Sequence, residues 1–124
     1  MVKFKRIDHI ALHVKNLLVS KEFYKFNFGF IDYYEQITSS GIKISYLKLG
    51  DTILELVERQ DPCSGGFHWC IETDDFDEAV SQLKKNQVEL AQAPHPTDAR
   101  ELREKGWRRV VYKGPDGEQI ELRG

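Results

Sequence analysis

The sequence predicts an α+β fold made of two similar modules, each with the element order strand, helix, strand, strand, strand. The first observation behind this prediction is the alternation of strand-like and helical spacing, which runs through the same order twice within 124 residues. The second is that each module carries a histidine in its first strand and a glutamate in its last, at matching places. We expect a single domain over 1–124, with module one at about 5–59 and module two at about 66–123.

Module one begins with a strand over residues 6–14, which is rich in β-forming residues and bounded by charges. A helix over 17–28 follows, because its apolar residues fall near helical spacing and Gly29 is a natural C-terminal stop. Turn-forming serine, glycine and aspartate residues separate the remaining strands. Three strands are expected there, at 30–37, 42–49 and 52–58.

Module two repeats this order and starts with a strand over 67–73. Asp75 is placed to cap the following helix, with Glu78 three residues later in a capping box. A loop over 94–106 and a Gly-Pro-Asp-Gly turn at 114–117 interrupt the rest of the module. Three strands are expected after the helix, at 88–91, 107–113 and 118–123.

Two histidines and two glutamates stand at matching places in the two modules: His9, Glu55, His68 and Glu121. The separation from histidine to glutamate is 46 residues in module one (9 to 55) and 53 in module two (68 to 121), where the loop is longer. Strand alternation puts each glutamate on the face opposite its leucine and isoleucine neighbours. A pseudo-twofold pairing of the modules would bring all four together. A shared divalent metal would then explain the two carboxylates, because burying a carboxylate unpaired is costly.

The composition of the chain argues against several classes of function. The 18 basic and 20 acidic residues give a formal charge of −2, which argues against nucleic-acid binding driven by bulk charge. No apolar run is long enough to cross a bilayer, and residues 1–6 lack the apolar stretch of a signal peptide. Cys63 and Cys70 form no CxxC motif, so we expect two free thiols and a cytoplasmic location, with one disulfide as the alternative.

Four stretches of the chain carry a family resemblance: residues 8–14, 21–24 with 29–30, 53–56 and 114–122. They resemble the vicinal oxygen chelate superfamily of glyoxalases, bleomycin-resistance proteins and dioxygenases, and the set of two histidines and two glutamates resembles bacterial glyoxalase I in particular. The resemblance implies two βαβββ modules in an open, cupped, eight-stranded mixed sheet around one divalent metal ion. It implies that His9, Glu55, His68 and Glu121 are the ligands, and that the protein is a homodimer acting on a small molecule.

Two imidazoles and two carboxylates suit Ni²⁺, Co²⁺, Zn²⁺, Fe²⁺ or Mn²⁺. The metal would act as a Lewis acid on a substrate with adjacent oxygens and would stabilise an enediolate. Glu121 would then move the proton between neighbouring carbons, with Glu55 as the alternative base. The resemblance thus implies a lyase or isomerase like glyoxalase I, the lactoylglutathione lyase.

Three further residues are candidates for binding the substrate: His13, Lys48 and Arg59. They favour an anionic molecule or a thiol adduct. His13 stands where glyoxalase I usually has an arginine, and Arg59 stands where an asparagine is common, so the glutathione contacts depart from the family pattern. A run of mixed charge at 98–109 is most simply a solvated helix or loop, although its position also suits a lid in which Arg103 or Arg108 contacts substrate.

Other functions compete with the glyoxalase interpretation. An epimerase acting next to a thioester carbonyl uses the same enediolate chemistry, so the metal site does not separate the two. Dioxygenases and fosfomycin-type transferases usually keep two histidines and one carboxylate, and Glu55 would be an extra ligand there. A metal-free binding or resistance protein commonly lacks the full ligand set, and the presence of all four candidates argues against that class.

Overall fold

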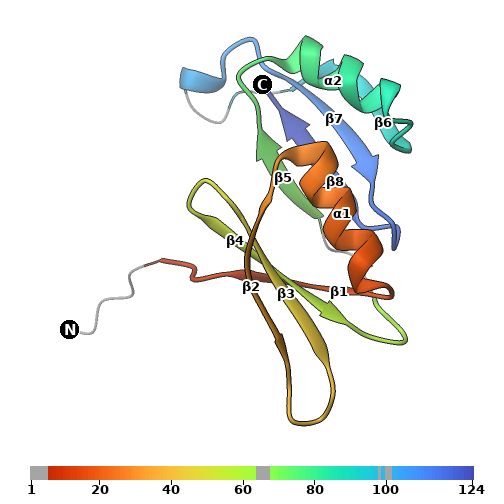
Figure 1. The fold of residues 1–124 in the computed structure, drawn as a ribbon. Coiled ribbons are helices and arrows are strands. Elements are labelled where there is room, and N and C mark those ends of the chain that lie inside the picture. Colours follow the sequence, from red (N-terminus) through yellow and green to blue (C-terminus); the bar gives the residue numbers. More distant parts are fainter. Residues whose placement is uncertain (1–5, 64–67, 98, 100–101) are drawn as a thin grey trace, which may run out of the picture. The chain divides into compact units, whose positions relative to one another are not determined.

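The computed structural model describes residues 6–63, 68–97, 99 and 102–124. The chain divides into two compact units, Met1–Cys63 and Ser64–Gly124 (Figure 1). The first unit holds module one and the second holds module two. Across the described residues, no helix is long and apolar enough to span a membrane.

Module one folds as one helix and one four-stranded sheet. Its strands lie in the order β1-β4-β3-β2, in which β1 pairs with β4 in parallel and the other neighbours are antiparallel (Figure 1). The helix α1 packs on β3 and β4. The elements are β1 (Ile10–Val14), α1 (Leu17–Phe28), β2 (Ile31–Ile37), β3 (Lys43–Leu49) and β4 (Thr52–Glu58).

Module two has the same topology. Its strands lie in the order β5-β8-β7-β6, again with a parallel pair first, β5 with β8, followed by antiparallel pairs. The predicted α+β fold with two βαβββ modules is therefore confirmed. The elements are β5 (His68–Glu72), α2 (Phe76–Lys85), β6 (Leu90–Pro96), a short 3₁₀ helix η1 (Leu102–Glu104), β7 (Arg108–Lys113) and β8 (Gln119–Arg123).

Side-chain caps fix where both helices begin. The Asn16 side chain accepts a hydrogen bond from the backbone of Val19, and the Asp75 carboxylate accepts one from Glu78. These bonds satisfy N–H groups that a helix leaves unpaired in its first turn. The predicted stop of α1 is also confirmed, because Gly29 has a φ of 77°, which favours glycine.

The apolar face of each central strand forms the core of its module. Leu54 and Leu56 are buried on β4, and Ile120 and Leu122 are buried on β8. The glutamates between them, Glu55 and Glu121, therefore point to the other face of their sheets, as strand alternation requires. This alternation is what positions the candidate site.

Two strands differ from the sequence prediction by more than two residues at one end. The strand β1 begins at Ile10, so residues 6–9, including His9, precede it rather than belong to it. The strand β6 extends to Pro96, into the segment that we expected to be a loop. Prolines are tolerated there because β6 is an edge strand with irregular pairing. The predicted strand residue Phe67 and loop residues 98, 100 and 101 lie outside the described residues.

Candidate functional site

In module one, the structure brings His9 and Glu55 together. Glu55 lies in the middle of β4, directly opposite Ala11 of β1, and His9 stands two residues before Ala11. The distance from His9 Nε2 to Glu55 Oε1 is 3.8 Å. The parallel pairing of the first and last strands of the module thus joins two residues that are far apart in sequence.

Module two repeats this arrangement with His68 and Glu121. Glu121 lies opposite Cys70 of β5, and His68 stands two residues before Cys70. The distance from His68 Nε2 to Glu121 Oε2 is 3.6 Å. Each module therefore carries the same histidine–glutamate pair at the same register of its parallel strands.

The geometry of both pairs fits two ligands of one metal ion. At 3.6 and 3.8 Å the facing atoms are too far apart for a hydrogen bond between them. They are closer than about 4.2 Å, the sum of two metal–ligand bonds of roughly 2.1 Å, so one ion is able to contact both. Among the described residues, no three His, Cys, Asp or Glu side chains are gathered into a complete metal site. Each module by itself thus offers one nitrogen and one oxygen donor.

Asp8 orients the imidazole of His9. Its Oδ2 lies 2.9 Å from His9 Nδ1, and this hydrogen bond is the main cause that lowers the pKa of Asp8 below 3.8. An aspartate that accepts the Nδ1 proton leaves the Nε2 lone pair free, and Nε2 is the atom that faces Glu55. The sequence analysis did not identify Asp8, although an Asp-His dipeptide before a strand is a usable signal.

The carboxylate of Glu55 is held by a tyrosine. Tyr46 of β3 lies opposite Glu55, and its hydrogen bond to Glu55 is the main cause that raises the pKa of Tyr46 to about 12. The rings of Tyr46 and His9 meet edge to face with their centroids 6.0 Å apart. The Glu55 side chain is 14% exposed. Module one therefore surrounds its glutamate with a phenol and an imidazole.

The carboxylate of Glu121 is held by two arginines instead. Arg109 Nε donates a hydrogen bond of 2.9 Å to Oε1, and Arg123 Nε lies 3.4 Å from the same oxygen. Both cations therefore act on Oε1, while Oε2 faces His68. The Glu121 side chain is 11% exposed. Arg123 stands two residues after Glu121 on β8 and so shares its face, whereas Arg109 reaches Glu121 only through the pairing of β7 with β8, which the sequence did not predict.

Arg123 is in turn fixed by the segment between β6 and β7. Its Nη1 donates to Oε1 of Glu104 at 2.9 Å and its Nη2 donates to Oγ1 of Thr97 at 2.7 Å. Glu104 is fully buried, so the interpretation of this segment as solvated is wrong for Glu104. The ion pair offsets part of the cost of removing both charges from water, and losing either partner would leave a buried charge unpaired.

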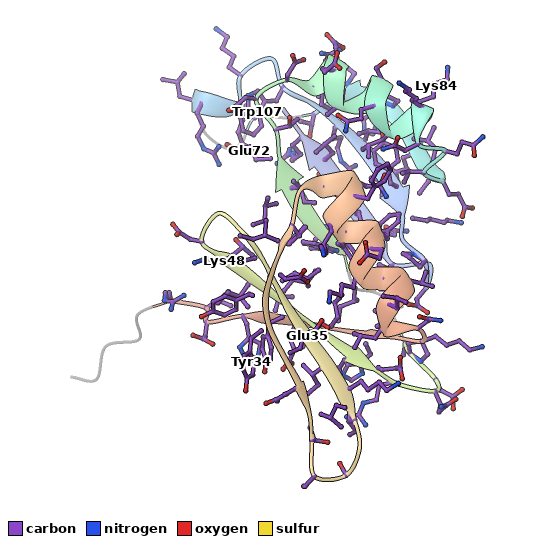
Figure 2. The ribbon with its side chains drawn as sticks, in the orientation of Figure 1. Tyr34, Glu35, Lys48, Glu72, Lys84 and Trp107 are labelled. Atoms are coloured by element: carbon purple, nitrogen blue, oxygen red, sulfur yellow. The ribbon has the colours of Figure 1, made fainter. Side chains whose placement is uncertain are left out.

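The three candidate substrate-binding residues lie in module one. Lys48 is on the strand β3 (Figure 2). Its Nζ lies 5.6 Å from the centre of the Tyr33 ring. His13 and Arg59 are exposed, and the Arg59 backbone donates to Val14. None of the hydrogen bonds or ion pairs found among the described residues links His13, Lys48 or Arg59 to His9 or Glu55.

The arginines suggested as lid contacts have protein partners instead. Arg103 donates to Glu72 and lies over the Trp107 ring; Glu72 and Trp107 are both labelled in Figure 2. Arg108 pairs with Asp77 and lies over a phenylalanine ring of α2. Nothing in these contacts supports a role for Arg103 or Arg108 in substrate binding.

Two hollows are present in module one. One, of about 370 Å³, is lined by Tyr33, Tyr34 and Tyr46, so it adjoins the residue that holds Glu55. A larger one, of about 680 Å³, lies on the α1 side of the sheet, where Glu35 and Glu58 line it. These groups already bind Lys21 and the start of α1. We therefore locate the candidate site at the histidine–glutamate pairs.

Known proteins resemble this chain in sequence and in structure. Human mitochondrial methylmalonyl-CoA epimerase is 29% identical over 96 residues, which cover 67% of this chain and 54% of the epimerase. This chain thus spans about half the length of the curated relatives that it matches.

Two solved structures illustrate the shared fold. An antibiotic binding protein from Streptomyces sp. CB03234 superposes with a TM-score of 0.79, 23% identity and coverage of 98% of this chain and 97% of that one. A fosfomycin resistance protein from Listeria monocytogenes, solved with Mn(II) and a dihydroxypropylphosphonic acid, gives a TM-score of 0.72, 18% identity and coverage of 97% and 92%.

A family model also matches almost the entire chain, over residues 6–122. This match, the repeated βαβββ topology and the structural neighbours agree with the resemblance seen in the sequence. The chain belongs to the Glyoxalase/Bleomycin resistance protein/Dioxygenase superfamily.

Proposed function

We propose that this protein is a metal-dependent enzyme in which His9, Glu55, His68 and Glu121 together hold one divalent ion. The observation that carries the proposal is the histidine–glutamate pair repeated at the same strand register in both modules. A nitrogen and an oxygen from each module make a mixed donor set suited to Ni²⁺, Co²⁺, Zn²⁺, Fe²⁺ or Mn²⁺. Ligation from both modules would also join them into the single domain expected from the sequence.

The proposed chemistry is proton transfer at a carbon next to a carbonyl. When bound, the metal supplies Lewis acidity to the substrate oxygens. Glu121 takes and returns the proton, with Glu55 as the alternative base. Tyr46 holds the Glu55 carboxylate and Arg109 holds that of Glu121, so both carboxylates are oriented before substrate arrives.

Two reactions fit this chemistry. The first is a lyase or isomerase reaction like that of glyoxalase I, which the full set of four ligands favours. The second is epimerisation next to a thioester carbonyl, which the similarity to methylmalonyl-CoA epimerases favours. Homodimer formation and a cytoplasmic location, both expected from the sequence, stay predictions.

Metal binding is the first test. We expect purified protein to contain one divalent ion per chain by elemental analysis. His9→Ala and His68→Ala should each weaken Ni²⁺ binding by about tenfold or more, because each removes a ligand. His95→Ala is the matched control, since His95 binds the backbone of Ala93 in β6 and should leave the affinity unchanged. Unchanged affinity in His68→Ala would contradict a site shared by the two modules.

Turnover is the second test. We would assay methylglyoxal with glutathione, and separately follow exchange of the acidic proton of a methylmalonyl thioester in D₂O by NMR. Turnover in the first assay supports the lyase, and exchange without it supports the epimerase. Tight binding of a drug-like molecule by protein that takes up no metal would instead favour a metal-free binding protein; the structural neighbour from Streptomyces is an antibiotic binding protein.

A further inference from the structure

Arg109 occupies the face of module two that carries the histidine–glutamate pair. In the antiparallel pairing of β7 with β8, Val111 lies opposite Glu121 and Arg109 lies opposite Arg123. Residues two apart on a strand share a face, so Arg109 and Glu121 lie on the same face of the sheet. The hydrogen bond from Nε to Glu121 confirms this placement.

The two arginines beside Glu121 differ in how their guanidinium groups are used. Arg123 engages Glu104 and Thr97 through both of its Nη atoms, and its side chain is 10% exposed. The bonds from Arg109 to described residues run through Nε alone, and its side chain is 28% exposed. Arg123 thus has a structural role, whereas the Nη1 and Nη2 atoms of the Arg109 guanidinium group are available to a ligand.

The balance of charges around Arg109 indicates that a ligand bound there would be an anion. The Arg123 charge is compensated by Glu104, and the Arg109 charge is compensated by Glu121. If the two glutamates neutralise a divalent ion, the positive charge of Arg109 is left without compensation among these residues. An anion bound at Nη1 and Nη2 would restore neutrality.

We propose that Arg109 binds a carboxylate of the substrate, which makes the preferred substrate an organic acid or acyl thioester with a free carboxylate near the reacting carbon. The planar guanidinium edge presents two parallel N–H donors, the geometry that a carboxylate accepts. This inference rests on the proposed function for the location of the reacting carbon. It goes beyond that function by naming the residue that selects the substrate and the group that it selects.

The test compares one probe with and without its carboxylate. Malonyl-N-acetylcysteamine carries a free carboxylate next to a thioester, and its methyl ester is the neutral match. Dissociation constants would be measured by calorimetry for the wild type, Arg109→Gln, Arg109→Lys and the control Arg108→Gln. Arg108 directly precedes Arg109 on β7, and its change to glutamine removes the same charge. Arg108 pairs with Asp77 of α2 instead of Glu121.

We expect the wild type to bind the acid about tenfold more tightly than the ester, as for one charged hydrogen-bonded contact. Arg109→Gln should abolish this preference through weaker binding of the acid, whereas Arg108→Gln should keep it. Arg109→Lys retains the charge but not the two-pronged geometry, so it should lower the preference to about threefold. A wild type without preference, or an unchanged preference in both Arg109 variants, would overturn the proposal.

Metal content and melting temperature, measured on the same samples, separate this inference from the proposed function. If Arg109 only positioned Glu121, its loss would weaken metal binding and weaken the acid and the ester equally. If no variant or wild type binds metal, the proposed function fails. If the wild type binds metal but shows no preference for the acid, this inference alone fails, because the proposed function requires only the metal site.

Discussion

Module one and module two share their backbone plan and differ in what surrounds the glutamate. Both have the same strand order, and both place a histidine two residues before the partner of the glutamate. In module one a phenol and an aspartate-bound imidazole surround Glu55. In module two a pair of guanidinium groups surrounds Glu121, one of them anchored on a buried glutamate.

The comparison shows that the repeated backbone positions each histidine–glutamate pair, whereas the surrounding side chains set its electrostatic environment. The register of the parallel strands brings histidine and glutamate together in either module, whatever residues stand on the neighbouring strand. The neighbouring strand then sets the electrostatics, with Tyr46 opposite Glu55 and Val111 opposite Glu121. One pair is held by a neutral donor and the other by cations. In the proposed reaction, the two glutamates therefore need not contribute equally to proton transfer.

The largest expected effect concerns the buried ion pair between Glu104 and Arg123 in module two. Glu104→Ala leaves the Arg123 guanidinium without its buried partner, which should lower the free energy of unfolding by about 3 kcal/mol. Urea denaturation measures this loss. Glu89→Ala is the control, because Glu89 makes only an exposed ion pair with Lys113 and should change stability by less than about 0.5 kcal/mol. An equal decrease in the free energy of unfolding of the two variants would show that the ion pair between Glu104 and Arg123 does not stabilise the fold.

A second variant tests the aspartate behind the module one histidine. Asp8→Asn removes the charge that holds the Nδ1 side of His9, so Ni²⁺ affinity should fall by about tenfold. Competition with a chelator measures this affinity. Asp74→Asn, an exposed change of the same kind, should leave it intact. Should both variants bind Ni²⁺ like the wild type, Asp8 has no part in orienting the ligand.

A third prediction concerns alkaline pH and the phenol of module one. The folded-state pKa of Tyr46, about 12, lies above the usual 10.0, so the folded protein retains this proton longer than the unfolded chain. The resulting stabilisation is present below pH 10 and is lost as the pH rises towards 12, by at most about 2 kcal/mol. A titration followed by tyrosinate absorbance should show one fewer tyrosine that ionises at high pH in Tyr46→Phe than in the wild type. An unchanged titration would remove Tyr46 as the partner of Glu55.

The smallest effect compares the helix caps of the two modules. Asn16→Ala and Asp75→Ala each remove a side-chain cap and should each cost about 1 kcal/mol of unfolding free energy. The loss should be smaller for Asn16, because Glu58 also accepts a hydrogen bond from the first turn of α1 at Leu17. Urea denaturation of both variants gives the ranking. A larger loss in Asn16→Ala would show that Glu58 does not support the cap.

Much of the fold follows from local patterns in the sequence. The helix α1 has the predicted bounds, and β4 has the predicted bounds as well, because spacing, capping and turn residues act over only a few positions. The ends of β1 and β6 were less accurate. The ends of a strand depend on its hydrogen bonds to the neighbouring strand, and the prolines of β6 are tolerated because it lies at an edge.

The candidate ligands were predictable for the same reason, since a repeated histidine and glutamate can be recognised from spacing and alternation alone. The residues around them were not. Tyr46 meets Glu55 through the register of β3 on β4, and Arg109 meets Glu121 through the register of β7 on β8. Register depends on turns and loops whose geometry the local pattern does not specify.

The sequence by itself thus determined the module order, the faces of the central strands and the four candidate ligands, because these depend on short-range periodicity. Only the tertiary structure decided that a phenol holds one glutamate and arginines hold the other. It also decided that Glu104, in a segment that looks solvated, is buried against Arg123. These contacts join side chains across strands and loops, and their free energy depends on burial, which sequence spacing does not report.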